Sequence, residues 1–165
     1  MKLLEISIRK AGPADAPAIA ELSCQLGYLT SVSQAERRLE AILGSQGHTL
    51  FVARLDSQIV GWLHVFLARR IESEPFAELG GMVVAEPHRR CGIGRRLVTA
   101  AEEWSVGCGA GRLRVRMRSD RDEARTFYGS LGFALEKVQD VFDRITDKEL
   151  KPSSSCDCRG RVEGK

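Results

Sequence analysis

The sequence predicts a single domain of the mixed α/β class, in which antiparallel strands form one part of a sheet and helical crossovers extend it. Three observations carry this prediction. The chain has 165 residues, enough for one domain with a proper core and too few for two ordinary ones. Apolar residues alternate with a period of two in some segments and recur with a helical period in others. The order of these segments places a hairpin at mid-chain and helix-linked strands after it.

The N-terminal part is predicted to contain one strand followed by two helices. Residues 4–11 alternate apolar and polar side chains, which is the period of a half-buried strand. Residues 12–28 carry apolar residues on one helical face, and Gly27 is expected to end that helix. A second helix is predicted within residues 31–47. Its first N–H groups are expected to be satisfied by a capping box made of Ser33 and Glu36.

Three strands are predicted next, and they form the centre of the sheet. Residues 48–55 and 58–69 are rich in β-branched and aromatic side chains and are separated by Asp-Ser, which indicates a hairpin. Residues 76–84 form the third of these strands. Its Gly80–Gly81 pair indicates a bulge or a close approach of another backbone.

The last predicted elements alternate between helix and strand. They are a helix over about residues 92–108, a strand over 112–119, a short helix over 121–132 and a last strand over 137–145. Four arginines alternate along the strand over 112–119, and we interpret them as a solvated face. Asp120 and Glu123 are expected to cap the short helix, and Gly132 to end it.

The composition excludes several classes of protein. Apolar residues make up 43% of the chain and charged residues 28%, which is typical of a soluble globular domain. No run reaches the roughly 18 apolar residues of a membrane helix, and no secretion signal is recognised, so we expect a cytoplasmic protein. A net charge of only +3 with 6% aromatic residues gives no indication of nucleic-acid binding. Residues 151–165 are rich in Ser and Gly and are expected to form a disordered tail.

The cysteines and histidines do not indicate a metal centre. An odd number of cysteines without framework spacing favours free thiols. One Cys-x-Cys pair without a second pair does not make a zinc site, and the three histidines are scattered. The sequence therefore predicts no metal site. The five cysteines are Cys24, Cys91, Cys108, Cys156 and Cys158.

The segment EPHRRCGIGRRL, residues 86–97, is the strongest candidate for a binding site. A strand followed by a helix that begins near Gly92 presents unpaired N–H groups and the positive end of the helix dipole, which suits a phosphate. A P-loop is excluded because no Lys-Ser/Thr follows, and a dinucleotide fingerprint lacks its third glycine at Leu97. A positively charged turn without a ligand remains the alternative at this point.

A second motif carries a resemblance to a known family. Residues 89–94 are followed about 30 residues later by Ala-x-x-Phe-Tyr-x-x-Leu-Gly-Phe, at residues 124–133. Together they resemble the GNAT superfamily of acyl-CoA-dependent N-acetyltransferases. The resemblance covers roughly residues 3–147 and is specific between 77 and 133. It implies a central twisted mixed β-sheet of six to seven strands flanked by about four helices, in one N-acetyltransferase domain over residues 1–150.

The resemblance implies that acetyl-CoA is the co-substrate. In the family, the loop matching Arg89–Arg95 binds the pyrophosphate through backbone N–H groups, and the strand matching Met82–Val84 pairs with the pantetheine amides. Arg90 departs from the family's common glycine, Cys91 from its common Lys or Arg, and Arg121 from its common Asn. The residues expected to contact the coenzyme are Met82, Val83, Val84, Arg89, Arg90, Cys91, Gly92, Ile93, Gly94, Arg95, Arg121 and Phe127.

The resemblance also implies direct acetyl transfer, and it gives two catalytic candidates. The tyrosine matching Tyr128 protonates the departing thiolate, which a phenol can do within hydrogen-bond reach. Glu78 is the candidate base, directly or through a water, because a protonated amine must lose a proton before it attacks a thioester. A core tyrosine and a surface glutamate are the alternative interpretations. Tyr28 lies where the family builds its acceptor lid.

We therefore expect an N-acetyltransferase acting on a primary amine of a small molecule or peptide. Aminoglycosides, polyamines, amino acids, and protein lysines or N-termini all stay open as acceptors, because fold does not fix substrate. The alternative outside enzymology is a non-catalytic acyl-CoA-binding regulatory module, against which the presence of both Glu78 and Tyr128 speaks. The expected partner is an amine-bearing acceptor, not nucleic acid or membrane. Because family members are often dimers, a homodimer is an assembly to be tested.

Overall fold

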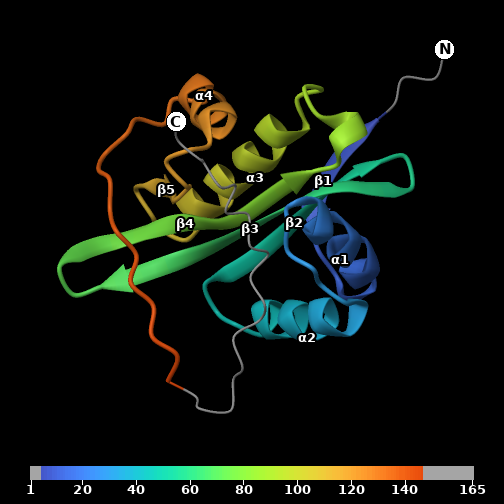
Figure 1. The fold of residues 1–165 in the computed structure, drawn as a ribbon, viewed down its shortest axis with the longest axis horizontal. Helices are drawn as coiled ribbons and strands as arrows, with labels where there is room; N and C mark the ends of the chain where they lie inside the picture. The colour runs from blue at the N-terminus through green and yellow to red at the C-terminus, as the bar shows by residue number, and fades with distance from the viewer. Residues whose placement is uncertain (1–4, 147–165) are drawn as a thin grey trace, which may run out of the picture. The chain divides into compact units, whose positions relative to one another are not determined.

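A five-stranded sheet organises residues 5–133, with its strands in the order β1-β2-β3-β4-β5 (Figure 1). The computed structural model describes residues 5–146. Strands β1 to β4 pair antiparallel and β5 runs parallel to β4, which confirms the mixed α/β class. The described part holds fewer strands than the six to seven expected. The strands are β1 (Ile6–Lys10), β2 (His48–Leu55), β3 (Gln58–Arg70), β4 (Ser73–Val84) and β5 (Leu113–Val115).

The α-helices cover the two faces of this sheet. Leu50 and Val52 of β2 belong to the apolar cluster that contains residues of α1 and α2. Phe51 and Ala53, which alternate with them, belong to the cluster that contains the buried side of α3. Alternation along β2 therefore divides the core, with α1 and α2 on one face and α3 on the other (Figure 1). The described α-helices are α1 (Ala16–Gln25), α2 (Val32–Leu43), α3 (Ile93–Gly107) and α4 (Asp122–Ser130).

Strand β4 carries the predicted bulge. His64 of β3 pairs with Gly81 and Val65 pairs with Leu79, so Gly80 is the extra residue. A Cβ at Gly80 would overlap Nδ1 of His64, so the close approach requires glycine. The parallel ladder between β4 and β5 ends at the same place, since its last pair is Leu79 with Val115. The final residues of β4 thus extend beyond the end of this ladder, and β5 is much shorter than the strand predicted over 112–119.

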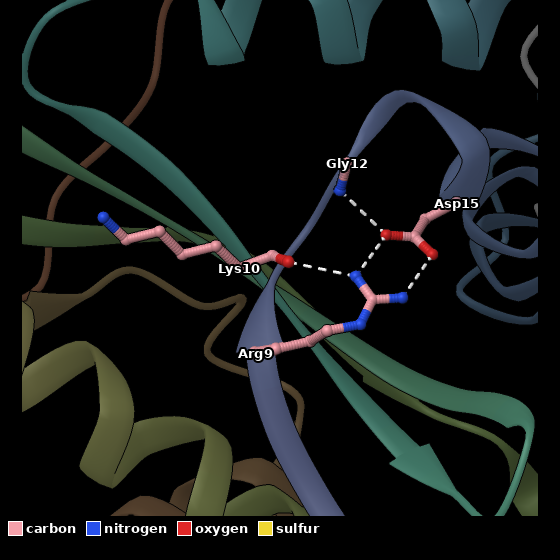
Figure 2. Close-up of polar contacts among 4 residues, drawn as sticks. All are labelled: Arg9, Lys10, Gly12 and Asp15. Carbon is pink, nitrogen blue, oxygen red and sulfur yellow. Dashed lines mark hydrogen bonds and ion pairs between the residues drawn. The ribbon is translucent and has the colours of Figure 1, made fainter.

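A partly buried ion pair joins β1 to the start of α1 (Figure 2). The guanidinium of Arg9 donates to both carboxylate oxygens of Asp15, at 2.7 and 2.8 Å, and also to the carbonyl of Lys10 at 3.0 Å. The backbone N–H of Gly12 donates to Asp15 Oδ2 at 2.8 Å. These hydrogen bonds, above all those from Arg9, hold the pKa of Asp15 below its usual value. They outweigh the opposite effect of burial, since the residue is only 7% exposed.

The two predicted helix caps are wrong. Helix α2 begins two residues earlier than expected, so Ser31 is its N-cap and accepts from the N–H of Gln34 at 3.2 Å. Gln34 Oε1 accepts from the N–H of Ser31 in return. At α4 the N-cap is Arg121, without a side-chain bond, because the carboxylate of Asp120 is paired with the guanidinium of Arg118 at 2.7 Å.

Residues 134–146 form a separate unit and contain no helix or strand, so the strand predicted over 137–145 is wrong. Within 137–145 the apolar residues fall at positions i, i+3, i+4 and i+7, whereas a half-buried strand needs alternate positions. They are Val138, Val141, Phe142 and Ile145. The predicted tail over 151–165, with Cys156 and Cys158, lies outside the described residues.

Candidate active site

The glycine loop, residues 89–95, connects the end of β4 to α3. A short 3-10 turn (Glu86–His88) precedes it, and Gly92 is the N-cap of α3 with φ +79°, in the left-handed region. The first helical bond runs from the N–H of Arg96 to the carbonyl of Gly92 at 3.1 Å. The N–H groups of Ile93, Gly94 and Arg95 therefore have no acceptor within the helix. A Cβ added at Gly92 would meet nothing within 4 Å, so the loop is open to a ligand there.

Arg90 occupies a second left-handed position in the loop. Its φ is +64°, and Asp56 in the β2–β3 turn is the only other described non-glycine residue with positive φ. A side chain with a Cβ is strained in this region, whereas glycine is not. The departure from the family pattern at position 90 thus falls where the backbone itself favours glycine. The loop keeps this conformation at a cost in stability.

The arginines of the loop and of the first turn of α3 point to different places. Arg89 Nε donates to the carbonyl of Val84 at 3.1 Å, which ties the loop to the end of β4. Arg96 donates to the carbonyl of Ile6 at 2.9 Å, which ties α3 to β1. Arg95 lines the hollow between α3 and β1. Ile93 is 2% exposed and belongs to the apolar core, and the thiol of Cys91 contacts the carbonyl of Arg89 at 3.4 Å.

Gly94 brings α4 against the start of α3. A Cβ at Gly94 would lie 3.0 Å from Cζ of Phe127 and 3.8 Å from Cε of Met82. The structure therefore brings together three of the predicted coenzyme contacts, from β4, α3 and α4. Gly94 is predicted from the sequence to bind phosphate, and its tight contact with Phe127 is a second reason for glycine there.

Tyr128 lies next to Phe127 in an aromatic group. Its ring meets those of Phe127 and Phe133 edge-on, with centroids 5.1 and 5.4 Å away. Burial raises the pKa of Tyr128, and the positive charge of Arg121 offsets part of this rise. The phenol is therefore protonated at neutral pH and can donate a proton or a hydrogen bond. Arg121, exposed at the start of α4, acts on this site through its charge.

Glu78 faces the side of the sheet covered by α1 and α2, because it pairs with Phe66 in the β3–β4 ladder and Phe66 shares that face with His64. Its side chain is 12% exposed and accepts from Nε of Arg116 at 3.1 Å. Arg116 was predicted to lie on a solvated face, so its contact with Glu78 is a correction to that prediction. The only signal for it was a row of arginines in the strand predicted to follow the one that bears Glu78.

A cavity of about 280 Å³ lies on the same face, between α1, α2 and the sheet. We call it the α1–α2 cavity. It reaches β4 at Gly80 and Gly81, and the predicted lid residue Tyr28 lines it. A more open hollow between β1 and α3 is lined by none of the catalytic candidates. Other lining residues of the α1–α2 cavity include Ile19, Leu26, Arg38, Ile42, Trp62 and His64.

His64 contributes a neutral wall to this cavity. Its Nε2 lies 3.2 Å from Nδ1 of His48, so one ring donates to the other. Burial, followed by the charge of His48, lowers the pKa of His64 to about 4. At neutral pH this imidazole is therefore uncharged. His48 and Phe66 stack with centroids 5.4 Å apart, which extends the aromatic surface behind the cavity.

Within residues 5–146, no three His, Cys, Asp or Glu side chains gather as the ligands of a metal would. In the same range, Cys24, Cys91 and Cys108 are free and exposed. No helix of this part of the chain has the length and apolar character needed to cross a membrane.

Comparisons with known proteins agree with this geometry. The chain is 35% identical over 138 residues to an aminoglycoside N(6')-acetyltransferase of Serratia marcescens. The aligned region covers 77% of this chain and 91% of that relative. It is 28% identical over 152 residues to an enzyme of the same name from Stenotrophomonas maltophilia, covering 90% of this chain and 96% of that relative.

Solved structures show the same fold. An aminoglycoside 6'-N-acetyltransferase of Acinetobacter haemolyticus superposes with a TM-score of 0.74 at 22% identity, over 86% of this chain and 99% of that one. Another aminoglycoside N-acetyltransferase, solved with coenzyme A, has a TM-score of 0.78 at 19% identity, over 88% and 98% of the two chains. Residues 18–133 match the acetyltransferase (GNAT) family. The chain therefore belongs to the acetyltransferase (GNAT) family and is an acetyl-CoA-dependent N-acetyltransferase.

Proposed function

We propose that the chain transfers the acetyl group of acetyl-CoA directly to a primary amine of a small molecule or peptide, within a ternary complex. The observation that carries this proposal is the left-handed Gly92 at the start of α3, open to solvent and next to the end of β4. Unpaired N–H groups at a helix start hold an anion well. This geometry supports binding of the coenzyme pyrophosphate by Gly92, Ile93, Gly94 and Arg95.

The end of β4 suits the pantetheine arm. Met82–Val84 lie beyond the last pair of the β4–β5 ladder, at Leu79 and Val115. An extended amide chain could pair with this stretch as an added strand. The Cys91 and Arg90 side chains are exposed at the loop, and Arg89 is bound to Val84, so we assign the grip on the phosphates mainly to backbone N–H groups.

Glu78 and Tyr128 are proposed as base and acid. Acetyl-CoA supplies the activated thioester. Glu78, directly or through a water, takes the proton of the attacking amine, whose lone pair forms the new C–N bond as the C–S bond breaks. Tyr128 gives its proton to the leaving sulfur. Arg116 holds the Glu78 carboxylate at 3.1 Å and is proposed as the residue that positions it.

The acceptor is tested with a panel of amines. The names of the two relatives place aminoglycosides in this panel, beside polyamines, amino acids and peptides with a free amine. The assay follows free thiol released from acetyl-CoA, and product mass identifies the acetylated amine. We expect amine-dependent thiol release well above slow hydrolysis. Tight acetyl-CoA binding in calorimetry with no turnover of any amine would instead favour the regulatory module.

A further inference from the structure

The α1–α2 cavity differs from a site for a polycation in the charges of its wall. We propose that the acceptor bound there is a monoamine with an apolar or aromatic body, rather than an amine that carries several further ammonium groups. This inference rests on the proposed acetyl transfer and assigns its acceptor class. It is carried by the residues that line the cavity.

No carboxylate lines the cavity in the part of the chain that the structure describes. Apolar and aromatic side chains from α1, α2 and the sheet form most of the wall. The charged side chain among them is Arg38, which is exposed and contacts Thr30 Oγ1 at 3.5 Å. The apolar and aromatic part includes Ile19, Leu26, Leu39, Ile42 and Trp62.

The carboxylates closest in sequence to this wall lie elsewhere. Glu21 of α1 and Glu36 and Glu40 of α2 are exposed and are not among the lining residues. Glu78 shares the sheet face of the cavity but is not among its lining residues, and as the proposed base its carboxylate serves the attacking amine and not a further ammonium group. An additional ammonium group on the acceptor would therefore enter without a carboxylate partner.

The imidazole of His64 does not add a negative or a positive charge. Its bond to His48 and its burial keep it neutral at pH 7. A largely apolar wall whose one charged side chain is the cationic Arg38 disfavours an ammonium group that loses water without gaining a partner. It favours the uncharged form of a single amine, which is the form that attacks a thioester.

The volume of the α1–α2 cavity also favours a small acceptor. At about 280 Å³ the cavity is at the small end of ligand sites, which range from roughly 300 to 1,000 Å³. Tyr28, which is 67% exposed, and Trp62 contribute aromatic side chains to the wall, which suit an aromatic ring. One ring on a short aliphatic amine suits these walls.

The first test compares kcat/KM for 2-phenylethylamine, spermidine and sisomicin, measured by thiol release from acetyl-CoA. We expect 2-phenylethylamine to be preferred over both polycations by at least about tenfold, roughly 1.4 kcal/mol. Equal or faster turnover of spermidine or sisomicin overturns the acceptor inference, while it leaves acetyl transfer to amines in place.

A pair of variants tests the charge of the wall. Arg38→Glu introduces a carboxylate at the cavity and is expected to shift the kcat/KM ratio toward sisomicin by several-fold. Arg37→Glu makes the same change one residue earlier, at an exposed position that does not line the cavity, and is expected to leave the ratio unchanged. Equal shifts in both variants would overturn the inference, since general surface charge would then account for them.

A binding measurement separates this inference from a failure of catalysis. The chain has two tryptophans, so Trp104→Phe leaves Trp62 as the fluorescent reporter of the cavity. We expect 2-phenylethylamine to change this fluorescence at a concentration at least tenfold lower than sisomicin does. That result without turnover of any amine contradicts the proposed function and supports the cavity assignment. Absence of any response to 2-phenylethylamine contradicts the cavity assignment.

Discussion

The glycine loop and the α1–α2 cavity are built in different ways. The loop is a short contiguous segment whose ligand groups are backbone N–H groups, exposed by the left-handed conformation at Gly92. The cavity is assembled from side chains of two helices and two strands, and its chemistry is set by which charges are present and which are paired. The loop should therefore be sensitive to any added Cβ, and the cavity to changes of charge.

The largest effect is expected from Gly92→Asp. The new side chain forces strain at φ +79° and sets a carboxylate where phosphate is proposed to bind. We expect the Kd for acetyl-CoA, measured by calorimetry, to rise at least about 100-fold, or roughly 2.7 kcal/mol. Gly109→Asp is the matched control, because Gly109 also has positive φ, +75°, and open space. Gly109→Asp should lose a similar amount of stability, while its Kd for acetyl-CoA stays unchanged. Equal Kd values in the two variants would contradict the assignment of the glycine loop to phosphate binding.

Tyr128→Phe keeps the aromatic packing and removes the proposed proton donor. We expect kcat to fall by about 100-fold, the lower end of general acid catalysis, with the Kd for acetyl-CoA nearly unchanged. Because the pKa of Tyr128 is raised, the wild-type protein should lose this donor only in strongly alkaline solution. An unaltered kcat in the variant would rule out the acid role.

Glu78→Gln tests the proposed base, which lies on the same face of the sheet as the α1–α2 cavity. Removal of a general base is expected to lower kcat/KM by about 100-fold without changing acetyl-CoA affinity. Arg116→Ala should give a smaller loss of the same kind, because it leaves the carboxylate in place without its partner. Arg118→Ala is the control, since Arg118 pairs with the exposed Asp120. A loss in Arg118→Ala as large as in Arg116→Ala would contradict the positioning role.

Asp15→Asn tests whether the ion pair between Asp15 and Arg9 also fixes the position of α1, a helix that lines the α1–α2 cavity. The variant loses charge-assisted bonds to Arg9 and is expected to cost about 1–3 kcal/mol of the free energy of unfolding, measured with urea. Because the folded-state pKa of Asp15 is lowered, its stabilisation is present above the usual carboxyl pKa and is lost as pH falls through the lowered value. The variant should lose this acid dependence; identical pH profiles would contradict the assignment.

The smallest effect is expected from Arg90→Gly in the glycine loop. Relief of the left-handed strain at φ +64° should raise stability by about 1 kcal/mol, seen as a higher Tm, with acetyl-CoA binding retained. Arg90→Ala removes the same charge but keeps a Cβ, so it should not share the gain. A gain of equal size in both variants would attribute it to charge instead of backbone conformation.

Local features were predictable because neighbouring residues decide them. The hairpin at 56–57, the bulge at Gly80 and the start of α3 at Gly92 each depend on a few consecutive residues, and all three are confirmed. The predictions of N-caps at Ser33 and Asp120 were wrong for a different reason. Several Ser, Asp and Glu residues near each helix start could have served as the cap, and their spacing does not decide between them. Spacing also does not predict the ion pair of Asp120 with Arg118.

The sequence by itself determined the family, the order of strands and helices up to residue 133, and the glycine loop, since each is encoded in contiguous motifs. Tertiary structure alone decided the contacts of Arg116 with Glu78, of Phe127 with Gly94, and of His48 with His64. These residues are distant in the chain and meet only through strand register and helix packing. The lack of a carboxylate in the wall of the α1–α2 cavity is also decided by tertiary structure, because Glu21, Glu36 and Glu40 of the two helices are exposed and do not line it.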